Sequence, residues 1–107
     1  MGLTTDKQAR KHTPIYSGVL SYFPLALASV ARVSWMGNEQ HNPGEPLHWA
    51  RGKSDDHMDA AIRHIIDYAT GTKIDDDGAA HLAKAMWRIG AQLQLDEESG
   101  YDNDNEG

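Results

Sequence analysis

The 107-residue chain contains no cysteine, which excludes disulfides, thiolate metal sites and a cysteine nucleophile. Aromatic residues make up only 7% of it, so a single copy can build a modest core and we expect self-association to complete that core. The longest apolar run, Phe23–Ala28, is far shorter than the roughly 20 residues of a membrane span, and the N-terminus lacks the apolar stretch of a signal peptide. We therefore expect a cytoplasmic protein without a membrane partner.

A surplus of basic charge is also missing. The formal net charge of −6 resides in residues 96–107, which hold six carboxylates and no lysine or arginine, whereas residues 1–95 carry ten basic and ten acidic residues. Such a balance gives no electrostatic footprint for polymeric nucleic acid. We expect residues 96–107 to form an acidic disordered tail and the polar residues 1–22 to form an arm, on either side of one domain at 23–95.

Three helical segments are predicted in that domain. The first begins near Pro24, which suits an initial helical turn, and Gly37-Asn38 is expected to end it. A loop rich in proline and glycine follows at 39–53. Because no convincing strand is present, the sequence predicts an all-α small helical bundle.

The other two helices follow this loop. One has Ser54 as its expected N-cap and runs to about Thr70, with Gly71 at the stop position and a predicted buried face. The last begins at Asp75–Asp77 and runs to about Leu95. Its apolar seam repeats at spacings of four, three and four: Leu82, Met86, Ile89 and Leu93.

Aspartates at the start of the second helix could hold a cation. Asp56 and Asp59 are three residues apart, and Asp55 and Asp59 four apart, so either pair can converge on one ion. Carboxylate oxygens suit Mg²⁺ or Mn²⁺. The alternative is that Asp55 and Asp56 only complement the helix dipole, although Asp59 borders the apolar stripe and lies beyond the terminus.

A second polar stripe runs along the last helix, opposite its apolar seam: Asp77, His81, Lys84 and Arg88. Asp77 and His81 could share a metal, or His81 could contact phosphate or act as a base. The alternative is an ordinary solvated face. His64 follows Arg63 directly, so the two side chains point about 100° apart, and His64 is free to face the first helix or a neighbouring subunit.

The loop before the second helix carries groups that recognise ligands. Trp49 can stack on a base, Asn38 and His41 can contact its edge, and Arg51 and Lys53 can meet phosphates. The alternative places Trp49 in the core with the other side chains solvated. Phosphate-binding glycine loops, a serine nucleophile elbow and the His-Glu-x-x-His motif are absent, as is any His-Asp dipeptide.

The order and spacing of short motifs over about residues 14–95 resemble the small phage-type dATP/dGTP diphosphohydrolases (MazZ-like), relatives of the MazG-like all-α nucleotide pyrophosphatases. The motifs are Pro14-Ile15-Tyr16, Tyr22-Phe23-Pro24, Gly37–Gly44, Leu47-His48-Trp49, Lys53–His57, Arg63-His64, Asp75–Gly78, His81 and Trp87-Arg88. The MazG-like signature pairs Glu-x-x-Glu with Glu-x-x-Asp. This chain has Asp56-x-x-Asp59 at the first spacing and Asp77-x-x-x-His81 in place of the second.

The resemblance implies hydrolysis of a purine deoxynucleoside triphosphate, dGTP or dATP, to the monophosphate and pyrophosphate by metal-activated water. It also implies Mg²⁺ or Mn²⁺ as cofactor and a homodimer or homotetramer, in the host cytoplasm if the protein is phage-encoded. The hypothesis assigns the metal to Asp56, Asp59 and Asp77, and catalysis to Asp59, Arg63 and His81. It assigns substrate binding to Asn38, His41, Trp49, Lys53, His64 and Lys84. The alternatives are a non-catalytic helical oligomer that binds a protein partner, and a module that senses nucleotides.

Overall fold

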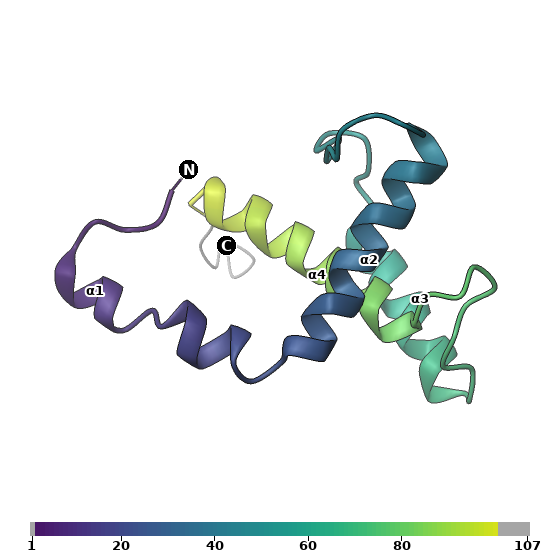
Figure 1. Cartoon of the computed structure of the whole chain (residues 1–107), viewed down its shortest axis with the longest axis horizontal. Helices are drawn as coiled ribbons and strands as arrows, with labels where there is room; N and C mark the ends of the chain where they lie inside the picture. Colours follow the sequence, from purple (N-terminus) through teal and green to yellow (C-terminus); the bar gives the residue numbers. More distant parts are fainter. Residues whose placement is uncertain (1, 101–107) are drawn as a thin grey trace, which may run out of the picture.

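The protein is an all-α bundle in the computed structural model, which describes residues 2–100 (Figure 1). Three helices form the body, and a short helix followed by one π-helical turn precedes them. An isolated bridge between Ile74 and Ala80 is the only β pairing in the described residues. In chain order the elements are α1 (Lys7–Lys11), the π-helical turn η1 (Tyr16–Leu20), α2 (Pro24–His41), α3 (His57–Ala69) and α4 (His81–Glu98).

Helix α2 begins at Pro24 as expected, but it does not end at Gly37-Asn38. It continues to His41, because one glycine costs a helix interior only about 1 kcal/mol and Asn38 is buried and hydrogen-bonded. Proline at position 43 disfavours helical geometry at Asn42, whose φ of −140° and ψ of 61° lie outside the helical region.

Helix α3 begins at His57 rather than after Ser54. Asp56 occupies the N-cap position, but its side chain caps no backbone N–H and instead contacts Arg88. The C-terminal prediction is confirmed, since the helix ends at Ala69 and Gly71 follows with a φ of 109°.

The aspartates expected to start α4 lie in a turn before it. Asp77 Oδ1 accepts a hydrogen bond from the Ala79 N–H, and Gly78 has a φ of 88°. These local bonds stabilise a turn, so α4 starts at His81 and then runs past Leu95 to Glu98. Residues 96–98 of the expected tail are therefore helical, and residues 101–107 lie outside the described part of the chain.

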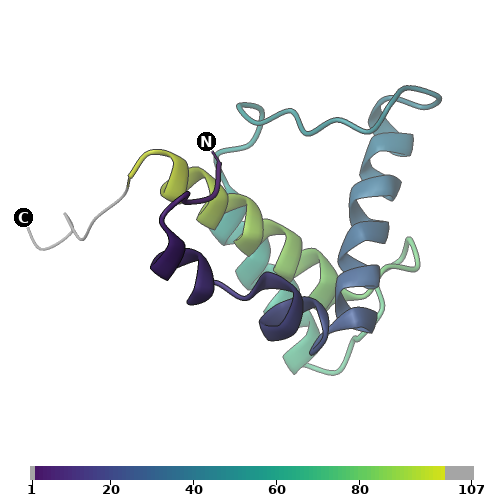
Figure 2. The same cartoon turned by 60° about the vertical axis from the view of Figure 1, so that its left-hand side comes forward.

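Helix α4 packs against both α3 and α2 (Figures 1 and 2). The residues that become fully buried are small, whereas the large apolar side chains predicted to form buried faces remain between 40% and 54% exposed in the single chain. The buried apolar residues are Ala60, Ala61, Ala79, Ala83, Ala85 and Ala91. The exposed stripes are Met58, Ile62, Ile65 and Ile66 on α3, and Leu82, Met86, Ile89 and Leu93 on α4.

The segment before α2, expected as an arm, holds α1 and η1. Asp6 caps α1 by accepting a hydrogen bond from the Ala9 N–H at 2.9 Å. Among the described residues no single helix is long and apolar enough to cross a membrane. One bent pair of segments, Lys7–Leu20 with Pro24–His41, passes that test by length and composition only.

Candidate functional site

The contact between α3 and α4 is polar where a helix pair is normally apolar. His64 on α3 meets His81 on α4. His57, seven residues earlier on α3, meets Arg88, seven residues later on α4, so the two helices run antiparallel. His57 and His81 are 2% and 3% exposed. The buried alanines Ala61 and Ala85 lie between these pairs and let the helices approach. We call this line of contacts between α3 and α4 the polar seam; it holds one polar cluster around His64 and His81 and a second around His57 and Arg88.

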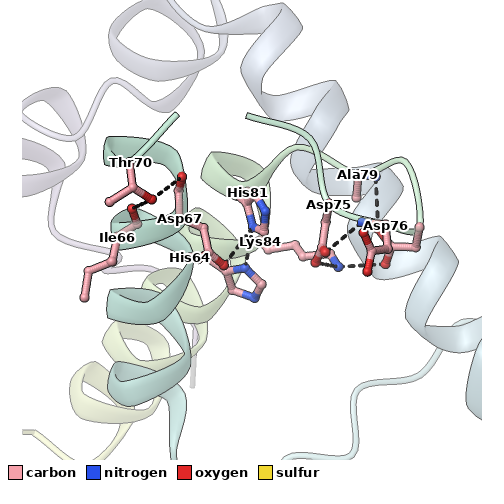
Figure 3. Close-up of polar contacts among 10 residues, drawn as sticks. His64, Ile66, Asp67, Thr70, Asp75, Asp76, Ala79, His81 and Lys84 are labelled. Atoms are coloured by element: carbon pink, nitrogen blue, oxygen red, sulfur yellow. Dashed lines mark hydrogen bonds and ion pairs between the residues drawn. The ribbon is translucent and has the colours of Figure 1, made fainter. Parts of the chain in front are cut away.

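The first cluster lies where α3 ends and α4 begins (Figure 3). His64 Nδ1 and His81 Nδ1 are 2.9 Å apart, and Asp67 Oδ2 lies 3.8 Å from His81 Nδ1. Asp75 reaches the same place from the turn, so that one ligand atom each of His64, Asp75 and His81 falls within 4.8 Å of the others. This is the only group of three metal-ligating side chains in residues 2–100.

Lys84 fixes the acidic turn against α4. Its Nζ donates to Asp75 Oδ2 at 2.6 Å and to Asp77 Oδ2 at 2.7 Å. The hydrogen bond from Lys84, helped by the Asp76 backbone N–H, lowers the pKa of Asp75 from 3.8 to about 2, and Lys84 lowers the pKa of Asp77 as well. Burial opposes the charge on Lys84, but its two carboxylate partners outweigh burial and raise the pKa of Lys84. All three groups are therefore charged at neutral pH.

The imidazole of His64 is held neutral. Burial lowers its pKa most, and the charges of Lys84 and Arg63 lower it further. A neutral imidazole has one bare nitrogen, which can accept a hydrogen bond or bind a metal ion.

The second cluster lies at the start of α3. Arg88 Nη1 is 3.5 Å from Asp56 Oδ1 and 3.2 Å from His57 Nδ1. Since a guanidinium only donates, His57 Nδ1 accepts, which leaves Nε2 as the ring nitrogen that carries hydrogen. That Nε2 is buried and has no hydrogen-bond partner in the described structure.

Trp87 connects this cluster to α2 and to the long loop. Its Nε1 donates to Ser34 Oγ at 2.6 Å, and its ring packs edge-on against Trp49 with centroids 5.8 Å apart. Arg51 covers the Trp49 ring at 4.4 Å and pairs with Glu98 at 2.6 Å. The loop is thereby held against α4 at two points.

The family model for the dATP/dGTP diphosphohydrolase N-terminal region matches residues 4–105, nearly the whole chain. The chain belongs to the dATP/dGTP diphosphohydrolase family. No curated protein and no solved structure matches it. The match confirms the resemblance found in the motifs, and it assigns the chain to the N-terminal domain of a family named for a hydrolase activity.

In this dATP/dGTP diphosphohydrolase domain the expected metal ligands do not form one group. Asp56 at the N-cap of α3 and Asp59 in its first turn are both exposed, and Asp56 is beside Arg88. Asp77 lies in the turn beyond the other end of α3, where it binds Lys84. The structure thus places Asp56 and Asp59 at the start of α3 and Asp77 beyond its other end.

The residues expected to bind the substrate differ in how deeply they are buried. Asn38 is buried, its Nδ2 donates to the Glu45 carbonyl at 2.9 Å, and its Oδ1 has no partner in the described structure. Trp49 is half-buried against Trp87, whereas His41 is exposed at the end of α2. Lys53 and Arg63, the expected triphosphate contacts, are both exposed.

Sequence reasoning missed the convergence of His64 with His81 and the roles of His57, Asp75 and Arg88. A signal was present in the spacing. His57, Ala61 and His64 repeat at four and three on α3, and His81, Ala85 and Arg88 do the same on α4. Two matching polar-small-polar faces predict a close polar helix contact.

Proposed function

We propose that the chain hydrolyses dATP or dGTP to the monophosphate and pyrophosphate, with water as the nucleophile. The match to the diphosphohydrolase family over residues 4–105 carries the proposal. The polar seam between α3 and α4 supports it, because it gathers carboxylates, imidazoles and the cations Lys84 and Arg88 along one line. A metal-triphosphate substrate needs both charges: carboxylates for the ion and cations for the phosphates.

The proposal assigns Mg²⁺ or Mn²⁺ to Asp56 and Asp59 with Asp77, together with His81 as a further ligand or phosphate contact. The donor set fits such ions, since Asp56 and Asp59 offer exposed carboxylate oxygens one helical turn apart. A bound ion of this kind polarises phosphate and lowers the pKa of water. Asp77 lies beyond the other end of the 13-residue α3 and is tied to Lys84, so one acidic site that includes all three aspartates requires a second copy.

The remaining residues would bind substrate. Lys53, Arg63 and Lys84 neutralise the triphosphate. His64, which lies near Lys84 between α3 and α4, is the remaining residue assigned to substrate binding. Asn38, His41 and Trp49 recognise the purine, with Asn38 Oδ1 as a buried acceptor that lacks a donor among residues 2–100. A base stacked on Trp49 would take the place that Arg51 occupies 4.4 Å above the ring.

We further propose that two copies associate through the α3–α4 stripes. Because the helices are antiparallel, both stripes lie on the side of the pair away from α2, and their large apolar residues stay about half-exposed. Ile66→Glu, at a position 54% exposed, should convert the oligomer to monomers of 11.8 kDa measured by light scattering. Leu3→Glu, at a position 73% exposed near the N-terminus, is the control and should leave the mass unchanged. If the wild-type protein is still a monomer at about 100 times the protein concentration used to measure activity, the proposed association is contradicted.

Hydrolysis is tested by incubating the protein with each deoxynucleoside triphosphate and Mg²⁺ or Mn²⁺, and separating the products. We expect monophosphate and pyrophosphate from dATP or dGTP, and a loss of at least 100-fold in kcat for Asp59→Asn. Glu39→Gln, which removes one exposed carboxylate from α2, should retain full activity. Nucleotide binding without turnover would assign a sensing role instead, and full activity of Asp59→Asn would exclude Asp59 as a ligand.

A further inference from the structure

The first cluster of the seam draws its donors from three successive parts of the chain. His64 comes from the last turns of α3, Asp75 from the connecting turn and His81 from the first residue of α4. His81 is 3% exposed, and all three ligand atoms lie within 4.8 Å of one another (Figure 3). The acidic residues Asp56 and Asp59 take no part in this group.

We propose that His64, Asp75 and His81 bind one divalent transition-metal ion, of the kind that imidazole ligands favour. Of the residues assigned above to Mg²⁺ or Mn²⁺, this site uses only His81, and it does not depend on whether the chain hydrolyses nucleotides. Two nitrogens and one carboxylate oxygen suit Zn²⁺ or Co²⁺, whereas Mg²⁺ and Mn²⁺ favour oxygen ligands.

The separation of the two imidazoles fits a shared ion. Nitrogens bound at about 2.0–2.1 Å to one ion, at angles between about 90° and 110°, lie about 2.9–3.4 Å apart. The observed distance between His64 Nδ1 and His81 Nδ1 is 2.9 Å. Only small ring movements are needed to aim both nitrogens at one point, and three protein donors leave a coordination position open.

The charges around the imidazoles favour a cation. Asp67, Asp75 and Asp77 place three carboxylates here against the ammonium of Lys84 and the exposed guanidinium of Arg63. Lys84 and the Asp76 N–H also hold the Asp75 carboxylate in place, at 2.6 and 2.7 Å. Such outer contacts orient a ligand before an ion arrives. Lys84 can stay with Asp77 when Asp75 turns toward the ion.

The experiment titrates chelator-stripped full-length protein with Co²⁺, followed by its visible absorption, and with Zn²⁺ and Mg²⁺ by calorimetry. We expect about one Co²⁺ or Zn²⁺ per chain and no comparable binding of Mg²⁺. His64→Gln and Asp75→Asn should weaken Co²⁺ binding at least about tenfold and change its spectrum. The buried His81 is left intact, and circular dichroism checks that both variants remain folded.

Two control variants separate this site from other donors. His12→Gln removes an exposed imidazole at the end of α1, and Asp59→Asn alters the acidic pair on α3. Both should bind Co²⁺ as the wild type does. Absence of Zn²⁺ and Co²⁺ binding would overturn the proposal and leave the His64–His81 contact as a hydrogen bond. Binding that Asp59→Asn abolishes and His64→Gln leaves unchanged would overturn it too. Neither result bears on turnover, which is measured separately.

Discussion

The ion pair between Asp75 and Lys84 should make stability depend on pH in a defined window. Asp75 has its pKa lowered from 3.8 to about 2 in the folded chain, chiefly by the Lys84 hydrogen bond. Because the folded pKa is below the unfolded one, the stabilisation is fully present well above pH 3.8. It declines as the pH falls toward 2 and is about half lost near pH 3.

The magnitude follows from the shift and from the exposure of the pair. At about 1.4 kcal/mol per pKa unit the shift corresponds to about 2.4 kcal/mol as an upper value. The side chains of Asp75 and Lys84 are 27% and 19% exposed, so solvent screens part of this energy. We expect a coupling of about 1 kcal/mol, larger than that of a fully exposed pair.

A double-mutant cycle measures this coupling. Asp75→Asn, Lys84→Met and the double variant are unfolded with urea at one protein concentration, with chelator present, at about pH 7 and about pH 3. The interaction energy should be about 1 kcal/mol at the higher pH and fall to about half of that at the lower. Because Asp77 also binds Lys84, Lys84→Met alone should lower the free energy of unfolding more than Asp75→Asn alone. A coupling near zero at neutral pH, or one that grows on acidification, would refute this reasoning.

Two further predictions concern local geometry. Gly71→Ala should lower the free energy of unfolding by about 1 kcal/mol, because a side chain is strained at a φ of 109°. Gly37→Ala should raise it by about 0.5–1 kcal/mol, because alanine favours the helix more than glycine does and nothing lies within 4 Å of the added methyl group. Equal urea midpoints for the two variants would contradict this. Ser34→Ala should lower the free energy of unfolding by about 1–2 kcal/mol, because the half-buried indole N–H of Trp87 loses its acceptor at 2.6 Å. Ser29→Ala, at an exposed position on the same helix, should lower it by less than about 0.5 kcal/mol. A difference below about 0.3 kcal/mol between the serine variants would show that the indole bond contributes nothing.

The number and class of the body helices could be predicted because periodicity and end signals are local. Pro24 and Gly71 mark ends that the structure confirms. The signals at Gly37 and Ser54 were wrong because distant contacts override them: Asn38 is held by the loop, and Asp56 is drawn to Arg88. Helix propensity is a weak prior of less than about 1 kcal/mol per residue, so one such contact is enough to move a boundary.

The site was harder to predict for a physical reason. Opposition of His64 and His81 depends on the register of two helices and on the turn at Asp75, and no pattern within one helix specifies either. The spacing identified the apolar faces of α3 and α4. These faces were predicted to be buried, but in the single chain they stay about half-exposed, because alanines rather than Ile62 or Ile66 fill the contact between the helices.

The edge-on contact between Trp49 and Trp87 makes the chain an optical reporter of its own loop. Trp49 belongs to the loop and Trp87 to α4, with ring centroids 5.8 Å apart, whereas the third tryptophan, Trp35, is 60% exposed. Release of the loop would separate the first two rings and place Trp49 in water, and their emission would change without any added dye. Replacing Trp35 by phenylalanine removes the background signal, so loop opening could be timed by stopped-flow fluorescence in the otherwise natural sequence.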